Sequence, residues 1–334
     1  MLSVLSVGKQ AKRMAIVICC CLLSSCEKLY ELDAEEYIGE NLVFNGMLTN
    51  EEPPYFFHLT RPAAISAEDK EYEGISDAII VITDVTENIK DTLRHIEPKQ
   101  DATFGFFSYT YYDYHEQKND TQYLYTHNKN ALGIYMTTRL YGTEGHSYLL
   151  EIFHNGKYYA SDIQKMEPAL VITDIKLKSI DLGEKGKTWA PCISFINPKD
   201  VDNYYLFSAG TRNSAKNIKR LFTTADYWEY SILSDENLEE EVVDFIIDDG
   251  ESPLGYPDGR HYPFISGGKA WVFANTLSKS CYEYFEQAIK QFRTDGGAYT
   301  PRPASIKGNI SGGVYGCFRV SAISEKSIKI NEDI

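Results

Sequence analysis

Two alternating segments that meet at an Asn-Gly pair constrain the fold of this chain more than any other feature. Residues 148–154 alternate apolar and polar side chains, Asn155 and Gly156 follow, and residues 157–161 continue the run. Side chains that alternate every second residue lie on opposite faces of a β-strand. Asn-Gly favours a two-residue turn whose central residues both need positive φ. The segment therefore predicts an antiparallel β-hairpin.

Strand-like runs extend over the rest of the chain. The sequence contains 25 Tyr and 16 Phe, which favour half-buried sheet positions. Several short strands within about 130 residues, without a helical pattern among them, predict an immunoglobulin-like β-sandwich over residues 39–166. Pro168 cannot donate to a strand ladder and marks a boundary. We therefore predict a mainly β protein, with a second β-rich domain over residues 167–334.

One α-helix is predicted in the second domain, over about residues 281–293. Ser280 and Glu283 have the spacing of a capping box, and Gly296-Gly297 follows the segment. Apolar residues recur at spacings of three and four, which predicts a single face packed on a sheet. That face consists of Tyr282, Phe285, Ile289 and Phe292.

The N-terminal segment predicts export and a lipid anchor. Three basic residues precede a ten-residue apolar run over 14–23, which is typical of a signal peptide and too short to span a bilayer. Leu23-Ser24-Ser25-Cys26 then resembles the lipobox of bacterial lipoproteins. This resemblance implies that residues 1–25 are removed as a signal peptide, that Cys26 is acylated, and that residues 26–38 form a tether.

The charge of the mature chain excludes two kinds of partner. Removal of residues 1–25, which carry three basic and no acidic residues, changes the formal charge from −15 to −18. Nucleic-acid affinity comes mainly from Lys and Arg that neutralise phosphates, so no nucleic-acid partner is expected. The same charge argues against a polybasic contact with anionic lipid headgroups. The predicted contact with the membrane is therefore the lipid on Cys26.

Three further cysteines remain in the mature chain. Cys192, Cys281 and Cys317 allow at most one intramolecular disulfide, which excludes a fold stapled by several disulfides. The sequence leaves open whether any of these residues pair, and which ones.

The candidate ligand-binding residues are tyrosines of the run 104–115. Alternation places Tyr109 and Tyr111 on one strand face and Tyr112 and Tyr114 on the other. An edge strand cannot bury both faces, so we expect one row to be exposed. Exposed tyrosines suit carbohydrate stacking or a protein interface. An ordinary sandwich strand remains the alternative interpretation.

The acidic segment 235–258 supplies the candidate metal ligands. Asp248, Asp249, Glu251 and Asp258 lie in a glycine-containing stretch and could hold Ca²⁺, which takes six to eight oxygen ligands. A solvated loop is the alternative. A carboxylate pair in this segment could instead serve a glycosidase-like hydrolase. The chain contains no HExxH motif and no G-x-S-x-G elbow, so no catalytic residue and no other cofactor is predicted.

Four stretches together resemble the bacterial lipoproteins catalogued as domain of unknown function 4249. They are the signal with Cys26, residues 53–61 with 75–84, residues 145–158, and residues 309–318, where Tyr315 and Cys317 replace the usual small and aromatic residues. The resemblance implies an outer-membrane lipoprotein, often encoded beside TonB-dependent transporters, with no established catalytic residue. We therefore expect a non-catalytic binding protein accessory to such a transporter. A surface hydrolase and an adhesive or structural surface module are the alternatives. The sequence leaves open whether the anchored protein faces the periplasm or the outside of the cell.

Overall fold

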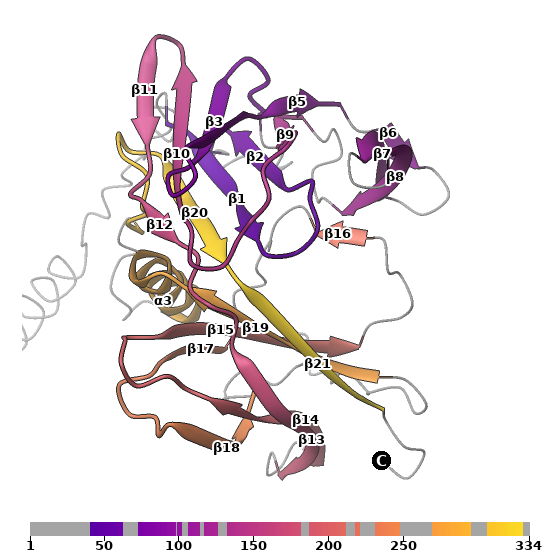
Figure 1. Ribbon diagram of the computed structural model, residues 1–334, viewed down its shortest axis with the longest axis vertical. Helices are drawn as coiled ribbons and strands as arrows, with labels where there is room; N and C mark the ends of the chain where they lie inside the picture. The colour runs from indigo at the N-terminus through magenta and orange to yellow at the C-terminus, as the bar shows by residue number, and fades with distance from the viewer. Residues whose placement is uncertain are drawn as a thin grey trace, which may run out of the picture. The chain divides into compact units, whose positions relative to one another are not determined.

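A computed structural model describes most of the chain after the predicted tether. The described residues are 41–62, 73–97, 99–101, 106–113, 117–125, 132–181, 187–211, 218–220, 231–247, 269–294 and 306–329. They are mainly β, with several antiparallel sheets and the helix α3, as the sequence predicts (Figure 1). The predicted signal peptide and tether lie outside these residues. No helix among them combines the length and apolar character needed to cross a bilayer.

Sheets A and B enclose one hydrophobic core. Sheet A has the order β20-β1-β2-β9-β5, and its strands are β1 (Val43–Thr49), β2 (Phe56–Thr60), β5 (Arg94–Ile96), β9 (Ile134–Met136) and β20 (Tyr315–Ser321). Sheet B has the order β11-β10-β3-β4, with β12 also paired to β10. Its strands are β3 (Ile79–Asp84), β4 (Ile89–Thr92), β10 (Ser147–His154), β11 (Lys157–Ala160) and β12 (Gln164–Lys165).

The predicted hairpin is strands β10 and β11 of sheet B. Asn155 and Gly156 have φ values of 48° and 72°, so the expected tight turn with two positive φ angles is confirmed. Alternate side chains of β10 are fully buried, from Tyr148 through Ile152, while Phe153 is exposed. The run 78–84 and the turn residue Asn88 predict one returning strand over 90–95. This prediction is wrong, because the chain leaves β4 of sheet B and enters β5 of sheet A within that segment.

Sheets E and F form a second layered unit with its own core. Sheet E has the order β13-β14-β18, with β13 (Val171–Asp181), β14 (Lys187–Ile196) and β18 (Glu241–Ile246). Sheet F has the order β17-β15-β19-β21, with β15 (Tyr204–Thr211), β17 (Ser231–Ser234), β19 (Lys269–Leu277) and β21 (Ile323–Lys329). Rings of Phe195 and Phe207 from the two sheets meet at 5.9 Å between centroids. A separate sheet C contains β6 (Lys99–Asp101), β7 (Phe106–Asp113), β8 (Lys118–Tyr125) and β16 (Ile218–Arg220).

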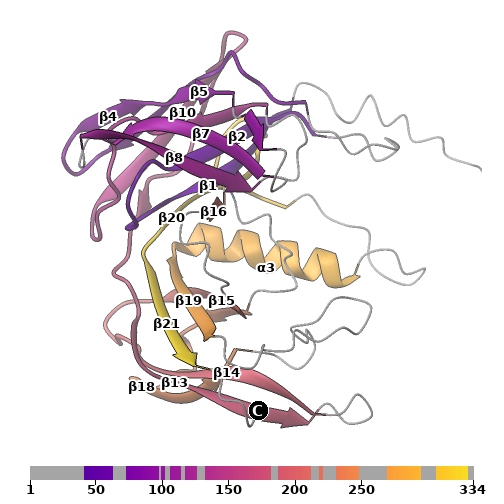
Figure 2. The ribbon, with the colours of Figure 1, turned by 90° about the vertical axis from the view of Figure 1, so that its right-hand side faces the viewer.

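Helix α3 (Lys279–Thr294) packs against sheet F and β20 through the predicted apolar face. Phe285 and Ile289 are buried, as expected. The capping-box prediction is wrong by two residues. The hydroxyl of Ser278 accepts a hydrogen bond from the N–H of Cys281 at 3.4 Å, so Ser278 caps the helix and Ser280 lies within its first turn. Figure 2 shows α3 beside β19 and below β20.

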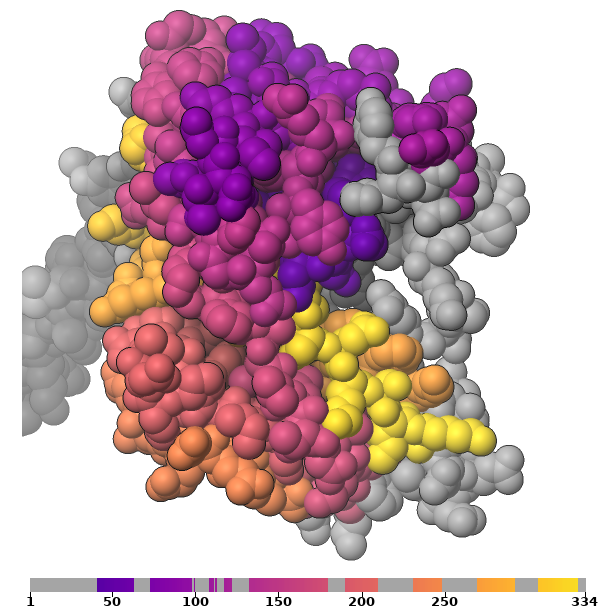
Figure 3. Space-filling view, in the orientation of Figure 1, coloured from indigo at the N-terminus to yellow at the C-terminus, as the bar shows by residue number. Residues whose placement is uncertain are grey.

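The C-terminal strands connect the two layered units. β20 pairs in parallel with β1 of sheet A, and β21 pairs with β19 of sheet F. Ala322 between them is fully buried, and its carbonyl accepts a hydrogen bond from the N–H of Thr276 at 3.0 Å. The C-terminal segment, yellow in Figure 3, lies beside indigo N-terminal residues and pink residues of β13. Strand pairing thus crosses the division predicted between residues 166 and 167, and residues 40–334 form one compact unit.

A buried histidine on β2 predicts a pH dependence of stability. The Nε2 of His58 lies 2.8 Å from the carbonyl oxygen of Leu132, to which the neutral ring donates. Burial lowers the pKa of His58 to about 4 from its usual 6.5. Because the unfolded chain binds a proton between pH 6.5 and 4 that the folded chain does not, stability is complete above pH 6.5 and falls towards pH 4. The difference is about 3 kcal/mol.

We expect this loss in urea unfolding measured at pH 7 and at pH 4.5. The His58→Gln variant keeps an N–H donor but does not titrate, so its stability should fall less between the two pH values than that of the wild type. Equal pH dependence in both proteins would contradict the role of His58.

Candidate functional site

The structure describes the side chains of two of the four candidate tyrosines, Tyr109 and Tyr112. β7 pairs antiparallel with β8, and the register sets Tyr109 opposite Gln122 and Tyr112 opposite Asn119. Tyr109 is half-buried, and the guanidinium carbon of Arg94 lies 5.7 Å from its ring centroid. The Tyr112 side chain is 47% exposed. The Tyr111 side chain and all of Tyr114 lie outside the described structure.

Part of β7 has an uncovered edge within the described part of sheet C. β6 pairs with residues 106–108 of β7, and β8 pairs along the whole length from Phe107 to Asp113. Within the described part of sheet C, Tyr109–Asp113 therefore has a strand neighbour on one side. Such a half-covered strand offers tyrosine side chains and backbone groups to a ligand or partner.

The candidate metal and hydrolase residues lie outside the described structure. Asp248, Asp249, Glu251 and Asp258 belong to the segment 248–268, so the calcium site and the carboxylate pair stay predictions. Within the described ranges no group of three His, Cys, Asp or Glu residues is arranged to hold a metal ion.

Two ionisable groups with shifted pKa values, Tyr135 and His58, have structural hydrogen-bond partners. Burial raises the pKa of Tyr135 to about 12, and its hydroxyl donates to the carbonyl of Ile75 at 2.9 Å and accepts from the N–H of Ala78 at 3.1 Å. His58 bonds a backbone carbonyl in the same way. These two groups therefore hold neighbouring loop residues against sheet A.

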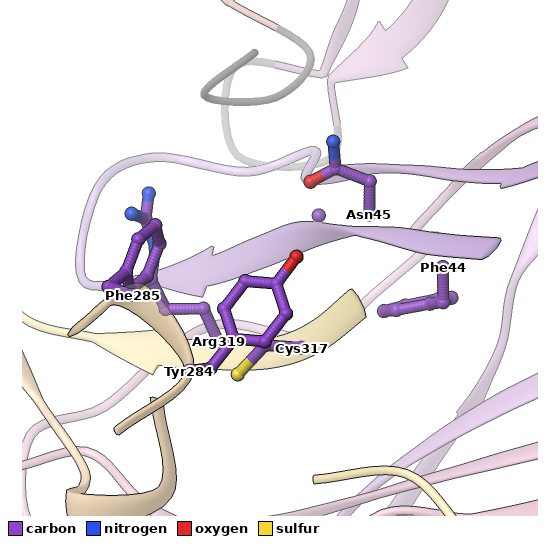
Figure 4. Close-up of a pocket in the computed structure, with 7 residues that line it drawn as sticks. Phe44, Asn45, Tyr284, Phe285, Cys317 and Arg319 are labelled. Atoms are coloured by element: carbon purple, nitrogen blue, oxygen red, sulfur yellow. The ribbon is translucent and has the colours of Figure 1, made fainter. Parts of the chain in front are cut away.

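A small hollow separates α3 from sheet A. Tyr284 and Phe285 reach from α3 towards β1 and β20, and the other walls are Phe44, Asn45, Gly46, Cys317 and Arg319 (Figure 4). The buried Arg319 places its guanidinium carbon 5.7 Å from the centroid of Phe285. The volume is about 20 Å³, which suits about one water molecule. This hollow is too small to be a ligand pocket as it stands.

Cys281 and Cys317 form a disulfide that joins α3 to β20. Both residues are buried, and their Cα atoms lie 6.3 Å apart. Cys192 is free and buried on β14, and burial raises the pKa of its thiol. The pairing that the sequence leaves open is therefore Cys281 with Cys317, which fixes the helix to the edge of the N-terminal sheet.

Removal of this disulfide should destabilise the whole unit. The bond closes a loop with a sequence separation of 36 residues, for which loop-closure entropy gives about 4 kcal/mol. We expect the Cys281→Ser/Cys317→Ser variant to unfold at lower urea than the oxidised wild type. The free-thiol variant Cys192→Ser should respond to reductant as the wild type does. Equal stability of the wild type with and without reductant, after complete thiol formation, would contradict this contribution.

The motif after α3 shapes the contact between β1 and β20. Gly316 has a φ of +101°, and a Cβ added there would overlap the carbonyl oxygen of Phe44. The side chain of buried Asn309 accepts from the N–H of Phe318 at 2.8 Å and donates to its carbonyl at 2.9 Å. The motif therefore lets β20 approach β1 closely and fixes its register. Sequence reasoning noted the stretch but did not assign it this role.

A family model confirms the predicted resemblance at the level of the domain. It is described as Domain of unknown function (DUF4249), and it matches residues 27–327. The chain belongs to this family. The match covers both layered units and the terminal motif, so these parts are one family domain. No curated protein matches the chain.

Proposed function

We propose that this DUF4249 protein is an exported, lipid-anchored protein of the bacterial outer membrane that binds a ligand or partner without catalysis. We further propose that it serves a TonB-dependent transporter as an accessory protein in nutrient uptake. The lipobox-like segment ending at Cys26 supports the anchor. The observation that carries the proposal is the buried disulfide Cys281–Cys317, because structural disulfides persist in oxidising compartments such as the periplasm and cell surface.

The binding part of the proposal relies on the tyrosine strand β7. Tyr112 is exposed, and Tyr109 lies beside the cationic Arg94. These two tyrosines lie on opposite faces of β7, beside the edge that β6 leaves uncovered. Tyrosine and arginine side chains at such an edge suit a protein interface, where they contribute a large share of the binding energy. We therefore assign Tyr109 and Tyr112 to partner contact, and extend the assignment to Tyr111 and Tyr114 on the predicted alternation.

We also propose that sheets A and B form an immunoglobulin-like sandwich. They are mainly antiparallel and share one core. Tyr148, near the start of β10, accepts a hydrogen bond from the upstream N–H of Thr143 at 2.7 Å. A tyrosine hydroxyl bonded to upstream backbone at a strand start is a feature of such domains.

A pull-down from detergent-solubilised outer membrane tests the binding role. We expect the mature lipidated protein to retain a TonB-dependent transporter in stoichiometric amount, detected by mass spectrometry. The Tyr109→Ser/Tyr112→Ser variant should retain at least about tenfold less. Tyr315→Ser is the matched control, because Tyr315 is an exposed tyrosine of sheet A. A protein recovered alone, with polysaccharide-cleaving activity, would contradict the proposal and favour the hydrolase.

A further inference from the structure

Three exposed apolar side chains form a row across the outer face of sheet B. The row consists of Ile79, Phe153 and Tyr158 on three adjacent strands, with Phe153 directly paired to both others. Their exposed fractions are 56%, 41% and 54%. The rings of Phe153 and Tyr158 lie 5.0 Å apart. We call these residues the hairpin row, because the β10–β11 turn follows it directly.

The polar groups beside the hairpin row are hydrogen-bonded, as in Tyr158, or buried away from a ligand, as in the ring of His154. The hydroxyl of Tyr158 donates to Oε1 of Glu151 at 2.9 Å, and this bond raises the pKa of Tyr158. At the end of the row, Nδ1 of buried His154 lies 3.3 Å from Oδ1 of Asp77. A sugar or small polar ligand would need free hydrogen-bonding groups beside the rings. The hairpin row therefore offers apolar contact rather than polar recognition.

The start of the described chain lies close to the same hairpin. The side chain of Asn41 lies beside Gly313, and Gly312 is packed against the ring of Tyr159, the neighbour of Tyr158. Ser311 also exchanges hydrogen bonds with Ala160 at the end of β11. Fourteen residues separate Cys26 from Asn41. Fully extended they reach at most about 50 Å, so a lipid on Cys26 holds this end of sheet B within about that distance of the bilayer.

We propose that the hairpin row docks on the membrane surface and orients the anchored protein. This inference rests on the proposed lipid anchor and assigns the row to the same bilayer. Aromatic side chains partition to the interface between lipid tails and headgroups. The formal charge of −18 on the mature chain disfavours contact with a second copy and with anionic headgroups. The contact is therefore apolar and made with a zwitterionic lipid surface.

Quenching by brominated lipids tests this docking in the lipidated protein. Two variants, Phe153→Trp and Ile89→Trp, place a tryptophan at either end of sheet B, since Ile89 is 45% exposed and pairs with Asp84 at the far end of β3. Both are reconstituted in phosphatidylethanolamine vesicles. We expect quenching beyond that of the wild type at position 153 and none at position 89. Equal quenching at both positions, or none at position 153, would overturn the docking.

Vesicle sedimentation of a non-acylated chain separates this inference from the lipid anchor. The Cys26→Ser protein should bind phosphatidylethanolamine vesicles, and binding should weaken as phosphatidylglycerol replaces the zwitterionic lipid. Adding Phe153→Ser/Tyr158→Ser should reduce binding by about tenfold or more. Adding Val85→Ser/Ile89→Ser, which removes two exposed apolar side chains at the other end, should not. Thermal melting tests whether the proteins that carry either pair of substitutions still fold.

Three further outcomes distinguish the hairpin row from other contact surfaces and from the lipid anchor. Vesicle binding that both pairs reduce equally would overturn the specific role of the hairpin row. A transporter pull-down that Phe153→Ser/Tyr158→Ser abolishes, without any vesicle binding, would assign the row to a protein interface instead. Failure to acylate Cys26, seen by mass spectrometry, would contradict the proposed anchor while the sedimentation result still stands.

Discussion

The Asp91→Ala variant should lose about 4 kcal/mol or more of folding stability, because Asp91 holds the loop that follows β9 of sheet A to β4 of sheet B. Asp91 lies on β4 of sheet B and is fully buried. Its Oδ2 accepts hydrogen bonds from the N–H groups of Thr138, Arg139 and Leu140, each at 2.9 Å. Its Oδ1 accepts from the hydroxyl of Thr138 at 2.6 Å. Alanine leaves these donors without their acceptor.

Urea unfolding measures this loss, with two variants as controls. Asp91→Asn keeps one carbonyl oxygen and should lose less than alanine, since that oxygen can still accept the backbone N–H groups. Asp162→Ala removes an exposed carboxylate and should change stability by about 0.5 kcal/mol or less. If Asp91→Ala loses as little stability as Asp162→Ala, water must accept hydrogen bonds from the N–H groups of residues 138–140, which would contradict the assigned role of Asp91.

The Gly316→Ala variant should separate β20 from β1 and cost about 4 kcal/mol. The left-handed φ of +101° contributes about 1–2 kcal/mol of this, and overlap with the Phe44 carbonyl contributes about 1–3 kcal/mol. Gly145→Ala is the matched control, because Gly145 has a φ of +84° with open space around it. The difference between the two variants therefore isolates the close approach of the strands.

Hydrogen exchange locates the effect of Gly316→Ala. We expect faster exchange of amides in β1 and β20, and in α3 through the disulfide to Cys317. Sheet E should change least, because none of its strands pairs with β1 or β20. Equal stability of Gly316→Ala and Gly145→Ala would contradict the assigned role of the terminal motif.

Local patterns predict the elements of this fold well. Alternation and Asn155-Gly156 predict the β10–β11 hairpin and its turn, because both depend on neighbouring residues. The apolar face of α3 is also found, since its spacing is local. The capping residue is Ser278 instead of Ser280 because the first turn begins earlier, and the Ser280 hydroxyl lies 3.3 Å from Oε1 of Gln164.

The same local patterns do not predict which strands pair when they lie far apart in the sequence. Val43 of β1 lies opposite Tyr315 of β20, and no local signal states which distant strands meet. The choice of Cys281 with Cys317 depends on that pairing, because β20 brings Cys317 to the helix. Asp91 resembles an ordinary polar strand residue in the sequence, and only the loop 138–140 explains its burial. Tyr112 is exposed, and the binding role of the tyrosine row stays a prediction.

Intact-mass measurement of the protein purified from its native membrane tests the central claim most directly. The proposal of an exported, lipid-anchored protein predicts a chain that begins at Cys26 and carries lipid on that residue. Its mass should be lower than that of the fully reduced chain by the two hydrogens lost in one disulfide. Peptide mapping should place the disulfide between Cys281 and Cys317. A full-length chain that retains residues 1–25, without lipid and with all its thiols reduced, would contradict it.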